Sequence, residues 1–249
     1  MKLIHKISSI KWVKISFWLL SILTLLIILI IENIDSKETP WTKTKINVIN
    51  NKTLAFVQNE TIGEILKENN FDFNDQVIES IDKLKVEEVL LRNPFIKQAE
   101  VYSDFHGVLN IDIKQKTPLI RIERTKGAYY LDHRGEFIPL SDNFTARVPV
   151  FHVESDSTKD ISLFNFYKNV EKRPLMKSQI ADVYVNSFEE YTFVPQFGNF
   201  IVELGDSDDL NEKFIKFEHT MNYILKNEGW EKYKAINLAF KDQVVCTKK

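Results

Sequence analysis

The fold is decided in the stretch Val86-Glu-Glu-Val-Leu-Leu-Arg-Asn-Pro-Phe-Ile-Lys-Gln-Ala-Glu-Val101, where the spacing of apolar residues changes from helical to extended. Val86, Val89 and Leu90 recur at intervals of three and four residues, as on one face of a helix. Pro94 disfavours helical geometry in the residue before it, so we expect the helix to end there. Beyond the proline the pattern alternates, which is typical of a strand with one buried face.

This strand is predicted to be the first half of a hairpin that turns at residues 104–107. Each strand has one inward row, which is Ala99, Val101 and Ser103 before the turn and Leu109, Ile111 and Ile113 after it. Polar residues occupy the alternate positions, so we expect the other face of the hairpin to contact solvent.

The residues before this stretch complete a small module. Ile46 and Val48 indicate a first strand, and Thr61-Ile-Gly-Glu64 has the pattern of a capping box at the start of a first helix. Asp82 is the predicted N-cap of the second helix. Residues 43–116 are therefore predicted to form a βααββ module, with two helices on one side of a small sheet.

An uncharged stretch, Ile15 to Ile31, stands near the amino terminus. Its 17 residues would cover about 26 Å as a helix, close to the roughly 30 Å of a bilayer's hydrocarbon core. Its only polar residues are Ser16, Ser21 and Thr24, so it lacks the polar face of a helix in a globular protein. We therefore predict a single transmembrane helix rather than a buried core helix.

The flanking charges predict the orientation of this helix. Lys2, Lys6, Lys11 and Lys14 precede it without any acidic residue, whereas Glu32, Asp35, Lys37 and Glu38 follow it. Positive flanks stay in the cytoplasm, so residues 1–14 are predicted to be a cytoplasmic tail. A spacer at 32–42 and the bulk of the chain would then lie on the periplasmic side of the inner membrane. A cleaved signal peptide is the alternative, but its apolar region is usually shorter and ends in a small-x-small site.

Residues 117–249 are predicted to form a mostly antiparallel β domain with flanking helices, which makes the whole chain α+β. Two hairpins are expected at 129–140 and 191–204, and a helix at 161–170. A late helix would bury one stripe formed by Leu210, Phe214, Phe217, Met221, Ile224 and Leu225. The last predicted element is a closing strand that runs through residues 235–245.

Charge and cysteine content exclude several classes of protein. The chain has 33 basic and 35 acidic residues, and removing the four lysines before the anchor and Glu32 leaves 29 and 34. A net charge of −5 argues against a nucleic-acid partner, which usually binds a basic patch. Cys246 is the only cysteine, so no intramolecular disulfide can form. An exported domain without disulfides fits a bacterial cell better than a eukaryotic secretory pathway.

The sequence contains no recognisable catalytic constellation. Its five histidines have no metal-ligand spacing, and neither a G-x-S-x-G elbow nor a glycine-rich phosphate loop is present. The pairs Glu87-Glu88 and Glu189-Glu190 are adjacent, so their side chains point apart on a helix or strand. We therefore expect no enzyme activity, no metal or cofactor, and no small-molecule substrate.

Taken in order, these motifs resemble the FtsQ/DivIB cell-division family. The helix that ends at Asn93-Pro94, followed by an alternating hairpin that stops before Pro118, resembles the POTRA module of that family. Tyr129-Tyr-Leu-Asp-His-Arg-Gly135 resembles its Tyr-x-Ile-Asp-x-x-Gly entry into a β domain. Gly205, Leu210 and Lys213 resemble the step into its late helix, and residues 236–246 resemble its closing strand.

The resemblance implies a non-enzymatic scaffold that links early division proteins to the FtsB–FtsL coiled-coil pair and to septal wall synthesis. A closing strand leaves one row of backbone groups unpaired, to which a partner can add a strand. Cationic Lys241, Lys248 and Lys249 near that edge favour an acidic partner. The predicted partner-binding residues are Ile236, Asn237, Leu238, Ala239, Phe240, Lys241, Gln243, Val244 and Val245.

Three alternatives remain at this point. The closing edge can be covered by the chain itself, which would prevent strand addition there. The protein can be a POTRA-bearing periplasmic chaperone or transport component, which a membrane barrel or a second POTRA copy would favour. The third alternative is an anchored hydrolase, but the sequence lacks a catalytic constellation for it.

The sequence departs from the family pattern at one position of the closing strand. The family commonly has a basic residue before the closing aromatic residue, whereas this chain has Ala239 before Phe240, so a partner contact through that cation cannot be transferred.

Overall fold

The structure is a computed structural model that describes residues 16–30, 39–49, 54–227 and 229–249. Residues 16–30 form a helix whose side chains are all exposed. Across these described ranges, no helix is long and apolar enough to cross a membrane. The predicted tail at 1–14, both ends of the predicted span at 15–31 and most of the predicted spacer lie outside the described residues.

The chain divides into two compact units. One is formed by Met1–Ile49 and Val57–Lys114, and the other by Asn50–Phe56 and Gln115–Lys249. We call them the first unit and the second unit.

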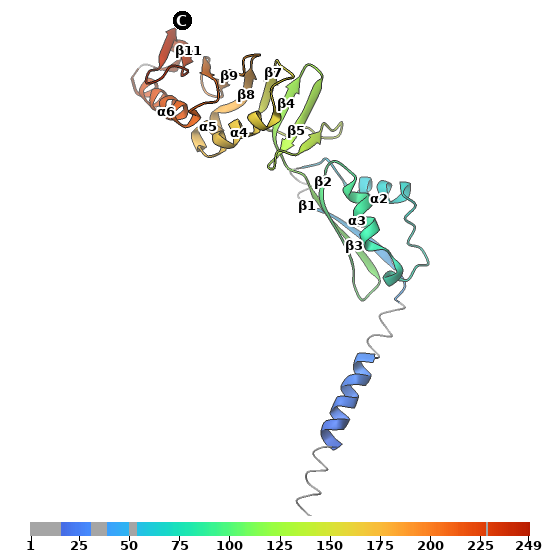
Figure 1. Cartoon of the computed structure of the whole chain (residues 1–249). Helices are drawn as coiled ribbons and strands as arrows, with labels where there is room; N and C mark the ends of the chain where they lie inside the picture. The colour runs from blue at the N-terminus through green and yellow to red at the C-terminus, as the bar shows by residue number, and fades with distance from the viewer. Residues whose placement is uncertain (1–15, 31–38, 50–53, 228) are drawn as a thin grey trace, which may run out of the picture. The chain divides into compact units, whose positions relative to one another are not determined.

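The first unit has the predicted βααββ order. Its elements are β1 (Lys43–Ile49), α2 (Asn59–Glu68), the 3-10 helix η1 (Ile78–Ser80), α3 (Lys83–Leu91), β2 (Ile96–Ser103) and β3 (Val108–Gln115). β3 lies between β1 and β2, and it pairs in parallel with β1. Both helices lie on one side of this sheet (Figure 1) and bury apolar residues that include Ile62 and Leu90. In the hairpin, Val101 and Ile111 are buried and the alternate positions are more exposed, as the alternation predicts.

The two helix starts differ in how well the sequence predicts them. Asp82 caps α3, because its carboxylate accepts a hydrogen bond from the Lys85 N–H at 3.0 Å, as predicted. The capping box at Thr61 is wrong, since α2 begins at Asn59 and its N-cap residue, Gln58, makes no side-chain capping bond. Thr61 therefore lies inside the first helical turn, where backbone carbonyls already serve as acceptors for the N–H groups that follow it.

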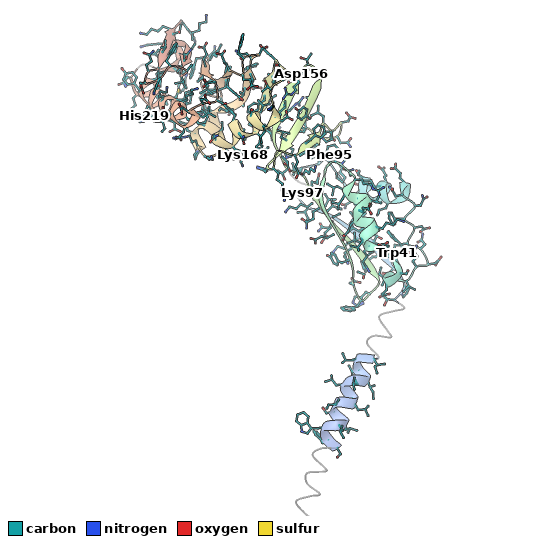
Figure 2. The ribbon with its side chains drawn as sticks, viewed as in Figure 1. Trp41, Phe95, Lys97, Asp156, Lys168 and His219 are labelled. Atoms are coloured by element: carbon teal, nitrogen blue, oxygen red, sulfur yellow. The ribbon has the colours of Figure 1, made fainter. Side chains whose placement is uncertain are left out.

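The first unit begins before β1. The Trp41 N–H donates to the Gln76 carbonyl at 2.9 Å, and the indole (labelled in Figure 2) lies 6.4 Å from the Phe73 ring. Gly107, in the hairpin turn, has a φ of +73°, and a Cβ there would lie 2.1 Å from the Pro40 carbonyl oxygen. Only glycine permits both this conformation and this close approach of the entering chain.

The second unit is built on one nine-stranded sheet. Its elements are β4 (Pro118–Arg124), β5 (Gly127–Asp132), β6 (Phe137–Pro139), β7 (Val150–Val153), α4 (Asp160–Glu171), α5 (Pro174–Gln179), β8 (Ile180–Val185), β9 (Tyr191–Pro195), β10 (Ile201–Gly205), α6 (Leu210–Asn227), the 3-10 helix η2 (Trp230–Lys232), β11 (Tyr233–Asn237) and β12 (Val245–Lys248). The strand order is β12-β11-β10-β9-β8-β7-β4-β5-β6. Five neighbouring pairs are antiparallel, whereas β4–β7, β7–β8 and β10–β11 are parallel. The predicted mostly antiparallel sheet is therefore a mixed one.

Helices α4, α5 and α6 cover one face of this sheet (Figure 1) and form the core with it. The Phe166 ring of α4 stacks on Tyr191 at 4.4 Å, and Phe217 of α6 meets Phe193 edge-on at 5.6 Å. The predicted stripe of α6 is buried except for Leu225, which is 52% exposed. Leu225 follows the buried Ile224 directly, so it lies about 100° further round the helix.

A short stretch that precedes the first unit's α2 in sequence packs into the second unit instead. The Phe56 ring lies 5.0 Å from Phe144 and 6.0 Å from Tyr130, both edge-on. The side-chain amide of Gln115 donates to the Leu54 carbonyl at 2.9 Å. The division between the units is therefore not a single cut in the sequence.

Two buried tyrosines of the second unit should respond in opposite ways to loss of the hydroxyl. The Tyr191 hydroxyl has no hydrogen-bond partner among the described residues, so Tyr191→Phe should leave the free energy of unfolding unchanged or raise it by about 1 kcal/mol. The Tyr130 hydroxyl accepts from the buried Ala146 N–H at 3.2 Å, so Tyr130→Phe should lower this free energy by about 1–3 kcal/mol. Urea unfolding of a soluble fragment of residues 39–249 measures both.

Tyr191 also makes the stability of the second unit depend on pH. Burial, and to a lesser extent Glu189, raise the pKa of Tyr191 from 10.0 to about 12. The unfolded tyrosine therefore ionises first, and its contribution to stability is present below pH 10 and is lost as the pH rises towards 12. Tyr191→Phe should lose less stability over this interval than the parent chain, and identical losses would contradict the assignment.

Candidate functional site

The candidate site lies at the end of the nine-stranded sheet where β11, a connection and β12 follow one another. β11 pairs in parallel with β10, and Glu203 lies opposite Asn237. It pairs antiparallel with β12 on its other side, where Ile236 lies opposite Cys246. The last two strands are thus a β-hairpin added to the sheet.

The prediction of one strand through residues 235–245 is wrong. β11 ends at Asn237, and the chain reverses through a turn at residues 240–242 in which Asp242 has a φ of 59°. Asp tolerates this left-handed conformation better than most residues, which favours a turn at this point. β12 then occupies the side of β11 that the sequence leaves open, so the chain does cover that edge itself.

The nine predicted partner-binding residues separate into three groups by burial. Ile236 and Leu238 are fully buried and belong to the core. Asn237 and Val244 are half-buried. The exposed residues are Ala239, Phe240, Lys241, Gln243 and Val245, of which the Phe240 ring is 48% exposed and Val245 is 42% exposed.

The connection between the two strands is fixed to the core. The Leu238 N–H donates to the Glu203 carbonyl at 2.8 Å. The Lys216 ammonium of α6 donates to the carbonyls of Leu238, at 3.2 Å, and Phe240, at 2.7 Å. A Cβ at Gly205, where φ is +70°, would lie 2.9 Å from the Ala239 Cβ, so the glycine permits this close packing. Nothing in the sequence near Lys216 indicates its role, because its partners lie 22 and 24 residues away.

Strand β12 is the last strand of the sheet order, so its outer side has no neighbouring strand among the described residues. The Lys249 N–H donates inward to the Lys232 carbonyl at 3.0 Å. Backbone groups of successive residues point to alternate sides of a strand, so the N–H and C=O of Lys248 point outward. The predicted partner-binding residues did not include Cys246, Thr247 and Lys248, although the run Val244-Val245-Cys246-Thr247 after Asp242 has the β-branched composition of a strand.

This end of the sheet presents backbone and side-chain groups of the kinds that can contact an extended peptide. Backbone groups at the edge, the half-exposed Phe240 ring and the exposed ammonium groups of Lys241 and Lys248 lie within two short segments. No cluster of His, Cys, Asp or Glu within the described part of the chain has the arrangement of a metal site. The His152 ring, elsewhere on the sheet, lies between Glu123 and Asp182 at 3.2 Å each and stacks on Tyr184 at 4.8 Å.

Comparison with known proteins agrees with this architecture. The family model described as FtsQ/DivIB, C-terminal related, matches residues 117–247, and a POTRA-like domain model matches residues 41–114. The cell division protein DivIB of Clostridium tetani (strain Massachusetts / E88) is 23% identical over 186 residues, which cover 69% of each chain. The first match covers 131 of the 249 residues, more than half of the sequence. The chain therefore belongs to the FtsQ/DivIB family.

Proposed function

We propose that this protein is a non-enzymatic scaffold of the bacterial division apparatus, which connects early division proteins to an FtsB-like and FtsL-like coiled-coil pair and to septal wall synthesis. Membership of the family and the name of the clostridial relative, a cell division protein, support a role in division. The fold supports a binding role, because the sheet ends in a strand that, within the described ranges, pairs on one side only.

The terminal strand is the observation that carries the proposal. In this mechanism the partner's extended segment pairs with the outer side of β12, and the exposed side chains of Phe240 and Val245 contact its apolar residues. Ile236 and Leu238 act from the core, where they hold the hairpin in place. The partner therefore adds a tenth strand to the sheet instead of pairing with β11.

The charges around the terminal strand favour an acidic partner segment. Lys241, Lys248 and Lys249 are exposed, and the first two lie on the turn and on β12 itself. Lysines on an edge strand disfavour pairing with unrelated strands. They also accelerate encounter with an oppositely charged segment and make it dependent on salt.

The proposal includes a membrane anchor. Residues 15–31 would span the inner membrane with residues 1–14 in the cytoplasm, which leaves both units on the periplasmic side. The lysine asymmetry of the sequence supports this orientation. A scaffold tethered in this way meets its partners within the plane of the membrane.

Site-specific crosslinking in dividing cells tests the binding edge. A photo-crosslinking residue in place of Val245, at the β12 end of the sheet, should capture an FtsB-like or FtsL-like coiled coil. The same residue in place of Phe137, which is 56% exposed on β6 at the other end of the sheet, should not. Capture of barrel proteins or of many unfolded clients at Val245 would instead favour a chaperone or transport role.

Proline substitutions distinguish binding from folding at this edge. Lys248→Pro removes an N–H that points outward, so it should weaken the partner's affinity by about tenfold with little change in melting temperature. Thr247→Pro removes an N–H that points towards β11 and should lower the melting temperature. Phe240→Ala should cost about 2 kcal/mol of binding energy as a central aromatic contact. Calorimetry of residues 39–249 against the captured partner segment measures these effects, and unchanged affinity for Lys248→Pro and Phe240→Ala would move the interface elsewhere.

Reporter fusions test the anchor. A reporter that is active only outside the cytoplasm, joined after Lys249, should be active, and a cytoplasmic reporter at the same place should be silent. Replacing Lys2, Lys6, Lys11 and Lys14 by glutamate should reduce the fraction of chains in this orientation, because the positive flank sets it. Activity of the cytoplasmic reporter in the parent chain would overturn the proposed topology.

A further inference from the structure

A second candidate binding site lies in the second unit, away from the terminal strand. A cavity of about 520 Å³ opens beside the amino ends of the three parallel strands β4, β7 and β8. Pro118 begins β4, Pro149 precedes β7 and Ile180 begins β8, and all three line the cavity. Its volume falls within the range of ordinary ligand sites, about 300–1,000 Å³.

The lining combines an apolar floor with cationic groups. Leu119, Val148, Ile180 and Ala181 supply apolar surface. Arg147 and Lys177 are exposed cations that line the same cavity. Arg147 has no ion pair or hydrogen bond with any described residue, and the Lys177 ammonium lies 3.9 Å from Glu171, the limit of an ion pair.

The lining also holds one acidic residue, Glu171, which pairs with a lysine outside the cavity. Glu171 binds the Lys168 ammonium at 2.7 Å, and Lys168 (labelled in Figure 2) lies on α4 outside the cavity. With Glu171 counted, the positive charges of Arg147 and Lys177 exceed the negative charge of the lining by one. Such a site matches a monoanion, whereas a phosphate dianion would also face the Glu171 carboxylate.

The Tyr167 hydroxyl also borders this cavity. Tyr167 is 3% exposed and lines the cavity, yet its hydroxyl makes no hydrogen bond within the described residues. Burial, and then Glu171, raise the pKa of Tyr167, so the hydroxyl stays protonated and can donate. The hydroxyl is not one of the fully enclosed polar atoms, so an acceptor bound in the cavity can reach it.

We propose that this cavity binds an acidic peptide segment of a partner protein, with a Glu or Asp carboxylate between Arg147 and Lys177, the Tyr167 hydroxyl as a donor to it, and neighbouring apolar side chains on the floor. Charge complementarity selects the carboxylate, and the four apolar side chains select a peptide over a free small acid. The site is separate from the proposed strand addition, because β9, β10 and β11 stand between β8 and β12.

Two synthetic pentapeptide libraries test the proposal on the full chain, purified in detergent micelles and immobilised. Both have random apolar residues at the flanking positions, and one has glutamate at the centre while the other has glutamine. The glutamate library should be retained about tenfold more, since a charge-assisted hydrogen bond is lost with glutamine. Equal retention of the two libraries would overturn the proposal.

Variants locate the binding. Arg147→Glu with Lys177→Glu should abolish the preference for glutamate, and Tyr167→Phe should reduce it several-fold at an unchanged melting temperature. The matched control is Arg134→Glu with Lys172→Glu, which makes the same change in net charge at exposed residues outside the cavity and should leave the preference intact. Loss in the control to the same extent would show a general charge effect and overturn the site.

Competition separates the sources of the anion. At equal concentration, a free pentapeptide with central glutamate should displace the retained library, whereas acetate and inorganic phosphate should not. Displacement by phosphate would show a phosphate site and refute the peptide assignment. None of these measurements involves β12, so failure here leaves the proposed strand addition unaffected.

Discussion

The second unit depends on the need to cover one apolar face of a single nine-stranded sheet. The buried face contributes rings such as Tyr191 and Phe193, and α4 and α6 meet them with Phe166 and Phe217 at 4.4 and 5.6 Å. Once the helices lie on this face, β12 and β6 remain as the two edge strands among the residues that the structure describes. An edge strand presents unpaired backbone groups, so each edge must either be protected from pairing with other chains or serve as a binding surface. β6 at one end has only three residues and ends in Pro139, which has no N–H to donate, whereas β12 has no proline.

Binding of a partner at β12 would depend in turn on how firmly the connection between β11 and β12 is fixed to the core. Leu238 is fully buried, its N–H is bound to Glu203, and the Lys216 ammonium binds the carbonyls on either side of Ala239. These contacts order the connection before any partner arrives. Pre-ordering lowers the entropy lost on association, so more of the energy of strand pairing appears as affinity. The polar contacts of one α6 lysine thus support a surface on another element.

Local signals predicted the first unit, and long-range pairing limited the prediction of the second. Asp82, Pro94 and the alternation after it fix their helix and hairpin within a few residues, and the structure agrees. The predicted helix start at Thr61 was wrong, because a capping-box pattern can also occur after a helix has begun, and α2 begins at Asn59. β4, in the interior of the sheet, and α5 were not predicted, and the parallel pairing of β4, β7 and β8 depends on segments about 30 residues apart. The predicted closing strand was a single strand, and β12 was missed because the chain returns after Asn237 through the seven residues 238–244 to pair with β11.

The two proposed binding places share one rigid element. The cavity lies at β4, β7 and β8, and β12 is four strand positions beyond β8 in the same sheet. At about 4.8 Å between neighbouring strands, these sites would be about 19 Å apart across the sheet. Three packed helices on the sheet would keep this spacing nearly constant, because close-packed interiors resist deformation. Two segments of one partner complex that are joined by a linker matching this spacing would bind both sites at once, with a gain in affinity. Segments joined by a linker too short to span the sites could occupy only one site at a time. If the protein is the scaffold proposed above, the distance between the two surfaces would itself arrange the partners.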